Sequence, residues 1–302
     1  RKTIWIIKER RMKMNIGFKS FHPIASFVFF VFSFSVCLIS SNPYLIAVCF
    51  ITGALYCFKL QGKKCISYLI KFILPFVILI TFFNGFVNHY GVTILFVLKN
   101  GNNFTLEALT YGFVSAVKIA NMLLWLECFN EIITYEKIIY LFGRLLPRIA
   151  LIFSKVFRFI PLIRNQSEEI IKAEKGIGNS NYTNVFDKLK KALRRISILI
   201  SWTLEKGIDT SDSMRARGYG LRGRTSYNSY IFSVKDLIST SVFTFSFVLL
   251  IISVEKLEAF YNPVIIIPEF DLMLFVLLFI FTLVLSAPVF LDIWEEKRWK
   301  IS

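Results

Sequence analysis

The sequence is poor in the residues that build metal and catalytic centres. It has two histidines, His22 and His89, and the zinc-protease pattern HExxH is absent. Its five cysteines show no CxxC spacing and lie within or beside apolar segments, which is typical of small buried or lipid-facing side chains. The phosphate-loop pattern GxxxxGKS/T is absent as well. We therefore expect no metal, no cofactor and no catalytic residue in this chain.

Acidic residues are also scarce. Only 20 Asp and Glu stand against 36 Lys and Arg, which gives a net charge of +16. Apolar residues, in contrast, make up 55% of the chain, and 33 residues are Phe, which is more than a soluble domain usually carries. This combination favours a membrane protein whose basic loops face anionic lipid. Because no nucleic-acid-binding module is recognisable, we expect the lipid bilayer and no nucleic acid as a partner.

Long apolar runs are the most prominent feature that is present. Asn42 and Pro43 separate the first two runs, which predicts a tight hairpin, and Pro75 predicts a kink in the third. Each run approaches the length of about 20 residues that a membrane-spanning helix needs. The predicted fold is therefore an all-α membrane protein with about six transmembrane helices plus long cytoplasmic amphipathic helices. The six predicted spans are 24–41, 44–58, 68–90, 105–129, 237–255 and 272–291.

The basic residues are distributed asymmetrically about these spans. One side receives 33 of the 36 Lys and Arg residues, the other receives Lys99 and Lys256, and Lys118 lies inside a span. The positive-inside rule then places both termini and the long central loop in the cytoplasm. The predicted parts are a cytoplasmic N-terminus (1–23), four spans (24–129), a cytoplasmic region (130–236), two spans (237–291) and a cytoplasmic C-terminus (292–302).

The cytoplasmic region contains two amphipathic stretches. The first, 137–175, is rich in arginine, and Pro147 and Pro161 are expected to break it into pieces. The second, 184–206, is predicted to be a helix that lies in the membrane interface with its cations on lipid phosphates, or that docks on the bundle while its ends meet a protein partner. Its apolar residues recur in steps of three and four and form one stripe: Phe186, Leu189, Leu193, Ile196 and Ile200.

A polar segment, "SMRARGYG", follows the second stretch. Ser211 and Asp212 are residues that often begin helices, so a short helix is predicted to start there. Gly218 is well placed as the residue after its end, where a positive φ is needed. Arg217 would then lie in the last turn, where the helix dipole favours a cation. Its guanidinium would project from an exposed tip, ready to bind a carboxylate or backbone carbonyls.

These residues resemble a known family. "SMRARGYG", with the following "GRTSY", resembles the second Ala-Arg-Gly motif of the transmembrane T component of energy-coupling factor (ECF) transporters, the EcfT/CbiQ family. "FHPIASFVFF" is similar to the family's opening, and "FRFIPLIRNQSEEIIKAEKGIG" is similar to the segment that leads to its first Ala-Arg-Gly motif. The resemblance covers nearly the whole chain.

The resemblance implies a scaffold in the cell membrane of a prokaryote. It would join two cytoplasmic ABC-type ATPase subunits to a membrane-embedded S component that binds a vitamin or a transition-metal ion. Each Ala-Arg-Gly motif would dock in a groove of one ATPase. The second motif falls on Ala216, Arg217 and Gly218. The first is degenerate, because Ile177 stands at the arginine position; it falls on Lys175, Gly176, Ile177 and Gly178.

Two other functions compete with the scaffold. An intramembrane enzyme would need paired carboxylates, a Ser-His set or a metal cluster at membrane depth. The spans offer only Lys118 and Glu127, which do not fall on adjacent helical turns. A stand-alone secondary transporter or channel usually shows internal repeats or polar, broken helices, and the sequence shows neither clearly.

Overall fold

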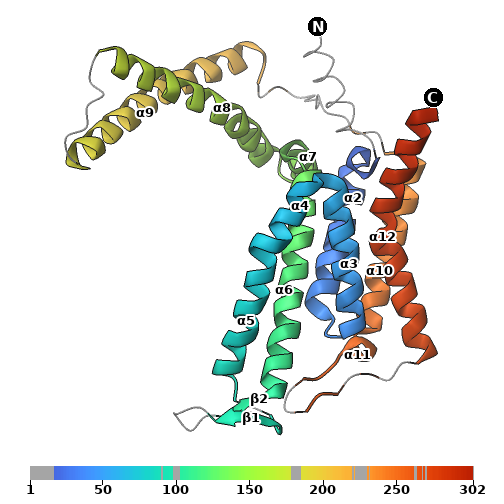
Figure 1. Ribbon diagram of the computed structural model, residues 1–302. Helices are drawn as coiled ribbons and strands as arrows, with labels where there is room; N and C mark the ends of the chain where they lie inside the picture. Colours follow the sequence, from blue (N-terminus) through green and yellow to red (C-terminus); the bar gives the residue numbers. More distant parts are fainter. Residues whose placement is uncertain are drawn as a thin grey trace. The chain divides into compact units, whose positions relative to one another are not determined.

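The computed structural model describes residues 17–89, 91–97, 103–177, 185–219, 221, 230, 232–261, 264–266, 268 and 271–301. The chain divides into two compact units. The first, residues 1–134 and 230–302, is a bundle of long apolar helices, and the second, residues 135–229, consists of three amphipathic helices (Figure 1). The prediction of an all-α membrane protein is confirmed, since the described residues contain almost no sheet.

The bundle contains a helix at each of the six predicted spans. Five of them are long and apolar enough to cross a membrane by length and composition, and the helix at the first span is shorter, with 17 residues. The six, in chain order, are α2 (Pro23–Ile39), α3 (Pro43–Gln61), the continuous run α4 (Lys63–Tyr68), η2 (Leu69–Ile73) and α5 (Leu74–Val87), then α6 (Leu106–Ile132), α10 (Val234–Ile252) and α12 (Leu272–Ile301).

The hairpin predicted at Asn42 and Pro43 is present between α2 and α3. Asn42 caps α3, because its side-chain oxygen accepts a hydrogen bond from the backbone N–H of Tyr44 at 3.0 Å. Pro43 follows as the first helical residue, where its missing N–H costs nothing. Sequence and structure therefore agree closely at this turn.

Pro75 is accommodated by a local change of helix type. The five residues of η2, just before it, form a π-helical turn, and Pro75 then lies in the first turn of α5. A proline cannot donate the hydrogen bond that continues an α-helix, and π turns are one way to absorb that loss. The helical run Lys63–Val87 thus continues through the proline over 25 residues.

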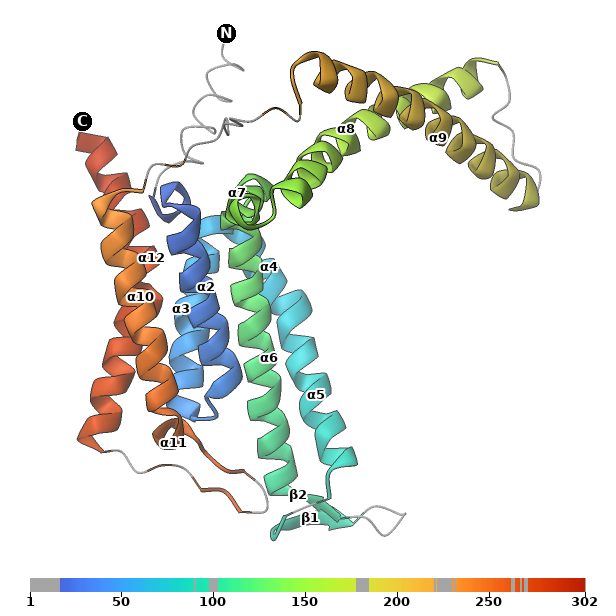
Figure 2. The same ribbon diagram turned by 180° about the vertical axis from the view of Figure 1, so that it is seen from behind.

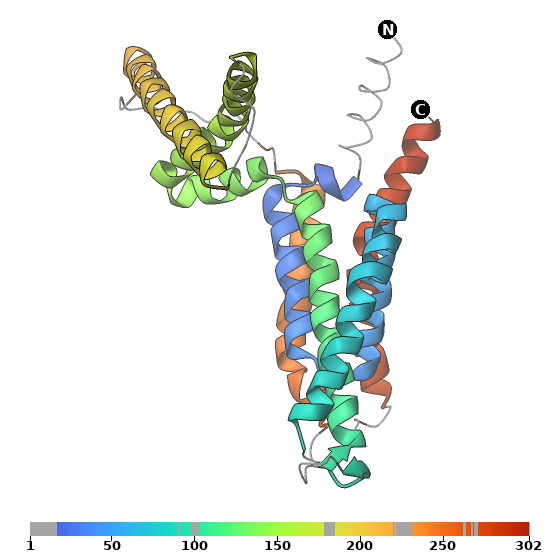
Figure 3. The ribbon, with the colours of Figure 1, turned by 60° about the vertical axis from the view of Figure 1, so that its left-hand side comes forward.

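The core of the bundle is aromatic. Trp125 of α6 is fully buried and packs edge-on against Phe29 of α2, with ring centroids 5.6 Å apart. Its indole N–H donates to the sulfur of Cys49 at 3.1 Å, and a side chain at Gly53 would meet the indole ring. Figure 3 shows α2 and α6 running side by side along the bundle. All five cysteines are buried free thiols, as expected of small apolar side chains.

Buried carboxylates connect the elements at one end of the bundle. Short helix η1 (Gly17–Ser20) lies there, and we refer to this as the η1 end. The backbone N–H of Phe18 donates to Asp292 of α12 at 2.6 Å, and that of His22 donates to Asp236 of α10 at 2.9 Å. Asp236 also forms a capping box with Ser233. These contacts join the starts of α2 and α10 to the last turns of α12.

The opposite end of the bundle carries short irregular elements (Figure 2). A small antiparallel pair, β1 (Ile94–Val97) and β2 (Asn103–Thr105), connects α5 to α6. Short helix α11 (Val254–Leu257) follows α10, and an isolated bridge pairs Phe260 with Ile266. We refer to this as the β1–β2 end.

The second unit differs from expectation at Pro161. It consists of α7 (Tyr135–Leu145), α8 (Pro147–Gly176) and α9 (Val185–Ala216). Pro147 does begin a new helix, but Pro161 lies inside α8 without breaking it, so that expectation was wrong. One internal proline removes a single backbone hydrogen bond, and a 30-residue helix can bend and continue on both sides of it.

Candidate functional site

The C-terminal end of α9 is built as a Schellman motif. The N–H of Gly218 donates to the carbonyl of Arg215 at 2.9 Å, and the N–H of Tyr219 donates to that of Met214 at 3.0 Å. Gly218 has φ +80°, the left-handed conformation that this ending requires. The expectation that Gly218 would end the helix with a positive φ is therefore confirmed.

The helix that leads to this end was predicted too short. Ser211 and Asp212 lie inside the continuous 32-residue helix α9 instead of starting a new one. Extending an existing helix adds one hydrogen bond per residue fixed, whereas starting a new helix is costly, so two residues with capping propensity do not interrupt it. The last helical residue is Ala216, so Arg215 lies in the last turn and Arg217 lies one residue beyond it.

Arg217 is exposed at this end. Its backbone N–H donates to the carbonyl of Ser213 at 3.2 Å, which fixes the main chain. Within the described part of the chain its guanidinium makes no hydrogen bond or ion pair. A guanidinium carries five N–H donors in a planar fork, which suits a carboxylate or a set of backbone carbonyls on another molecule.

The C-terminal end of α8 has a different geometry. Lys175 lies in its last turn, and Ile177 follows Gly176, the last helical residue, with φ −80° and 83% of its surface exposed. Gly176 is not among the described glycines with positive φ, so the two helix ends are not equivalent. Gly178, the last residue predicted for this motif, lies outside the described residues.

An ion pair joins α8 and α9, which cross each other in Figures 1 and 2. The Nε of Arg195 lies 2.6 Å from a carboxylate oxygen of Glu174, and both side chains are largely buried, with exposed fractions of 23% and 18%. Glu174 immediately precedes the predicted first motif. The ion pair therefore holds that end of α8 against α9. The sequence reasoning missed this contact, because nothing in the spacing of the two residues indicates it.

The apolar stripe predicted on α9 is present and longer than expected. Leu204 and Ile208 extend it by two further helical turns, and α8 leaves all its members more than half exposed. Apolar faces of this size normally meet a partner or a membrane. The stripe consists of Phe186, Leu189, Leu193, Ile196, Ile200, Leu204 and Ile208.

The residues considered for intramembrane chemistry do not meet. Glu127 accepts a hydrogen bond from Gln61 at 2.6 Å, whereas Lys118 contacts the hydroxyl of Ser41 at 3.4 Å. No group of three or more His, Cys, Asp and Glu side chains within the described residues has a geometry that could hold a metal ion. The residues GYGLRG at 218–223 match the spacing GxGxxG of dinucleotide-binding sites. That motif binds a dinucleotide only where it follows a strand, and here it follows helix α9, so it does not indicate dinucleotide binding.

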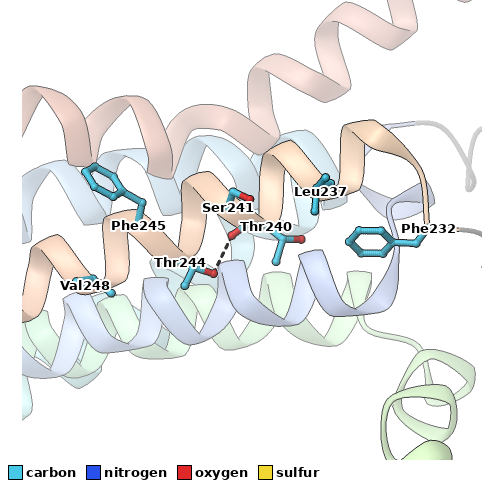
Figure 4. Close-up of a pocket in the computed structure, with 7 residues that line it drawn as sticks. All are labelled: Phe232, Leu237, Thr240, Ser241, Thr244, Phe245 and Val248. Carbon is cyan, nitrogen blue, oxygen red and sulfur yellow. Dashed lines mark hydrogen bonds between the residues drawn. The ribbon is translucent and has the colours of Figure 1, made fainter.

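A hollow along α10 offers no reactive group (Figure 4). It has a volume of about 360 Å³ and is lined mostly by apolar side chains. The hydroxyls of Thr240 and Thr244 donate to backbone carbonyls of the preceding turn, so they stabilise the helix and do not face a ligand as donors. The lining residues are Phe232, Leu237, Thr240, Ser241, Thr244, Phe245 and Val248.

Comparison with known proteins points to a transport family. The sequence model of the family described as "Cobalt transport protein" (CbiQ) matches residues 19–227. The chain is similar to "Energy-coupling factor transporter transmembrane protein EcfT" of Lactobacillus helveticus (strain DPC 4571), with 36% identity over 97 residues, 32% of this chain and 35% of that protein. It is also similar to "Energy-coupling factor transporter transmembrane protein EcfT 1" of Listeria monocytogenes serotype 1/2a (strain 08-5578), with 31% identity over 96 residues, 31% of this chain and 36% of that protein. Each match thus spans about a third of the relative.

Proposed function

The chain belongs to the cobalt transport protein (CbiQ) family, and on that basis we propose that it is the transmembrane scaffold of an energy-coupling factor importer. In this role it joins two ABC-type ATPases to an S component in the membrane. The two relatives are named as transmembrane proteins of such transporters, which supports the role. The chain itself performs no catalysis: the ATPases hydrolyse ATP, and the S component selects a vitamin or a transition-metal ion.

The observation that carries the proposal is the exposed Arg217 at the end of α9. A Schellman ending fixes the backbone around it, so the guanidinium leaves a rigid support instead of a flexible loop. We propose that Ala216, Arg217 and Gly218 enter a groove on one ATPase. There the guanidinium would bind a carboxylate or carbonyl oxygens, and the lack of a side chain at Gly218 would permit close approach.

The end of α8 would make the second, weaker contact. Lys175 supplies a cation at the predicted first motif, and Ile177 supplies an exposed apolar side chain in place of the arginine. Two unequal helix ends suit two unequal grooves. We therefore propose that the ATPase pair of this transporter is a heterodimer.

The chain is a membrane protein, and its charge pattern supports one orientation. We propose six spans, with both termini and the second unit in the cytoplasm of a prokaryotic cell. The ATPases are cytoplasmic, so this orientation brings Arg217 to the compartment where they act. The exposed stripe of α9 supports an assembled state, because a neighbouring protein or lipid must cover it.

Co-purification tests the docking role of Arg217. The tagged chain is co-expressed with the ATPases and extracted in mild detergent, as wild type and as Arg217→Glu. Charge reversal should weaken the complex by about 30-fold or more, since a desolvated charge pair lost from an interface typically costs 2–5 kcal/mol. The membrane bundle should stay folded, because Arg217 contributes nothing to its core.

Arg215→Glu is the matched control, because it places the same change two residues away on the helix. It should retain most of the complex. Wild-type recovery of the ATPases with Arg217→Glu would refute the docking site. If neither form recovers any ATPase, the scaffold role fails, and a stand-alone secondary transporter becomes the alternative.

A further inference from the structure

Lys118 lies in the membrane-spanning helix α6 without an acidic partner. Its Nζ contacts the hydroxyl of Ser41 at 3.4 Å, and none of the salt bridges within the described residues includes it. The side chain is only partly exposed. A cation in such a place is costly unless an anion or water compensates it, and intramembrane charges are commonly functional.

Lys118 lines a small pocket whose polar groups are mostly hydrogen-bond donors. The pocket has a volume of about 190 Å³, and no acidic residue lines it. The hydroxyls of Tyr111 and Ser115 make no hydrogen bond within the described part of the chain, and the hydroxyl of Ser41 keeps its hydrogen when it accepts from Lys118. Its walls are Ser41, Tyr111, Val114, Ser115, Lys118, Ala259, Phe260 and Tyr261.

The pocket is held in shape by contacts that do not use these donors. The hydroxyl of Tyr261 donates to the backbone carbonyl of Ser41 at 3.0 Å, which ties the loop after α11 to the α2–α3 hairpin. Burial raises the pKa of Tyr261, so its hydroxyl stays protonated and keeps this bond. The next residue in the hairpin, Asn42, is fully buried, and among the described residues its Nδ2 finds no hydrogen-bond partner.

The position of the pocket suggests where its ligand comes from. Ser41 lies in the hairpin where α2 ends and α3 begins, and the pocket is thus on the side away from the η1 end. The charge pattern assigns this side to the outside of the cell. Tyrosines such as Tyr111 and Tyr261 gather where a helix bundle crosses the headgroup layer.

We propose that this pocket binds a phosphate group, supplied by the headgroup of an outer-leaflet phospholipid. Lys118 provides the positive charge, and the hydroxyls of Tyr111, Ser41 and Ser115 donate hydrogen bonds to the phosphate oxygens. Lysine binds phosphate well as a compact point charge. The bound lipid would fix the α2–α3 hairpin and the loop after α11 against α6. The proposal does not depend on the ATPase-docking role.

Native mass spectrometry of the purified, delipidated protein in a maltoside detergent tests the proposal. Phosphatidylglycerol is titrated into wild type, Lys118→Gln and Lys256→Gln, and inorganic phosphate is titrated in a parallel series. Lys256 is the control, because it is an exposed cation beyond α10 that contacts Met273 instead of the pocket. Lys118→Gln should weaken lipid binding by about tenfold or more, as expected for a lost hydrogen bond to a charged group. Lys256→Gln should leave it within about twofold.

The two titrations distinguish the sources of the phosphate. Lys118-dependent binding of phosphatidylglycerol alone supports the lipid assignment. Lys118-dependent binding of inorganic phosphate alone supports the phosphate site but overturns its assignment to lipid. If wild type and Lys118→Gln bind each probe equally well, the proposed phosphate site is refuted. Tyr111→Phe removes one hydroxyl and should weaken lipid binding by less than Lys118→Gln does. This variant tests the site even if Lys118→Gln fails to fold.

Discussion

Gly218 is the residue on which the presentation of Arg217 depends. Its φ of +80° lies in the left-handed region, where a residue with a Cβ is strained by about 1–2 kcal/mol. A Cβ at this position would also come within 3.0 Å of the side chain of Leu221. The two hydrogen bonds that end α9 both require this conformation. The glycine of the Ala-Arg-Gly motif is thus explained by helix-end geometry, independent of any partner.

Gly218→Ala should therefore loosen the end of α9 and weaken the proposed ATPase contact. We expect faster amide hydrogen exchange for the last turn, by about five- to 30-fold, which corresponds to the strain of 1–2 kcal/mol. Exchange measured by mass spectrometry on peptides that cover residues 210–219 checks this. Unchanged exchange would mean that the ending does not hold Arg217 in place.

Gly207→Ala is the opposite control within the same helix. Gly207 lies in the interior of α9, and a Cβ there would meet nothing within 4 Å. Alanine is favoured over glycine inside a helix by about 0.5–1 kcal/mol, so this variant should slow exchange in α9. Two Gly→Ala changes 11 positions apart in the printed sequence are thus expected to act in opposite directions.

At the scale of elements, the length of the apolar runs predicted the helices of the six spans, and the steps of three and four between apolar residues predicted the stripe on α9. The errors lie where a local signal competed with helix continuation. Ser211 and Asp212 are common at helix starts, and Pro161 is common at breaks, yet both positions lie inside long helices. Contacts between distant segments, such as that of Asp292 with the backbone of Phe18, have no signal in a single sequence.

The ion pair between Glu174 and Arg195 should determine how α8 and α9 act together. The pair joins the C-terminal end of α8 to the first third of α9. Without it, the end of α8 should move independently of α9. A double-mutant cycle with Glu174→Ala and Arg195→Ala, read from hydrogen exchange in both helices, should give a coupling energy of about 1 kcal/mol.

The exposed pair Arg164–Glu168 within α8 serves for comparison. Its atoms lie 3.7 Å apart, and both side chains are mostly in solvent, with exposed fractions of 81% and 56%. Its coupling energy should not exceed about 0.5 kcal/mol. Equal coupling in the two pairs would argue against a special role for Glu174. If the ATPase rate of the assembled complex also stays constant in Arg195→Ala, the ion pair plays no part in linking ATP hydrolysis to transport.

At the scale of the whole molecule, the bundle and the charge pattern support the same orientation of the bundle in the membrane. Asp292 and Asp236 join η1, α2, α10 and α12 at one end. Lys19 of η1 and Lys59, which forms an ion pair with Glu296 of α12, lie at that end, whereas Lys256 lies in the short helix α11 at the opposite end. By the positive-inside rule, we propose that the basic end faces the cytoplasm.

Cysteine labelling in intact cells tests this orientation with little background, because all five native cysteines are buried. A membrane-impermeant maleimide should modify Lys256→Cys in whole cells and Arg215→Cys only after the cells are opened. Both positions are exposed, so accessibility to the reagent depends on the side of the membrane. Labelling of Arg215→Cys in whole cells would invert the topology and put Arg217 out of reach of any cytoplasmic ATPase. The expected pattern would instead confine the ATPase contacts to the basic end and leave the Lys118 pocket facing the outer leaflet.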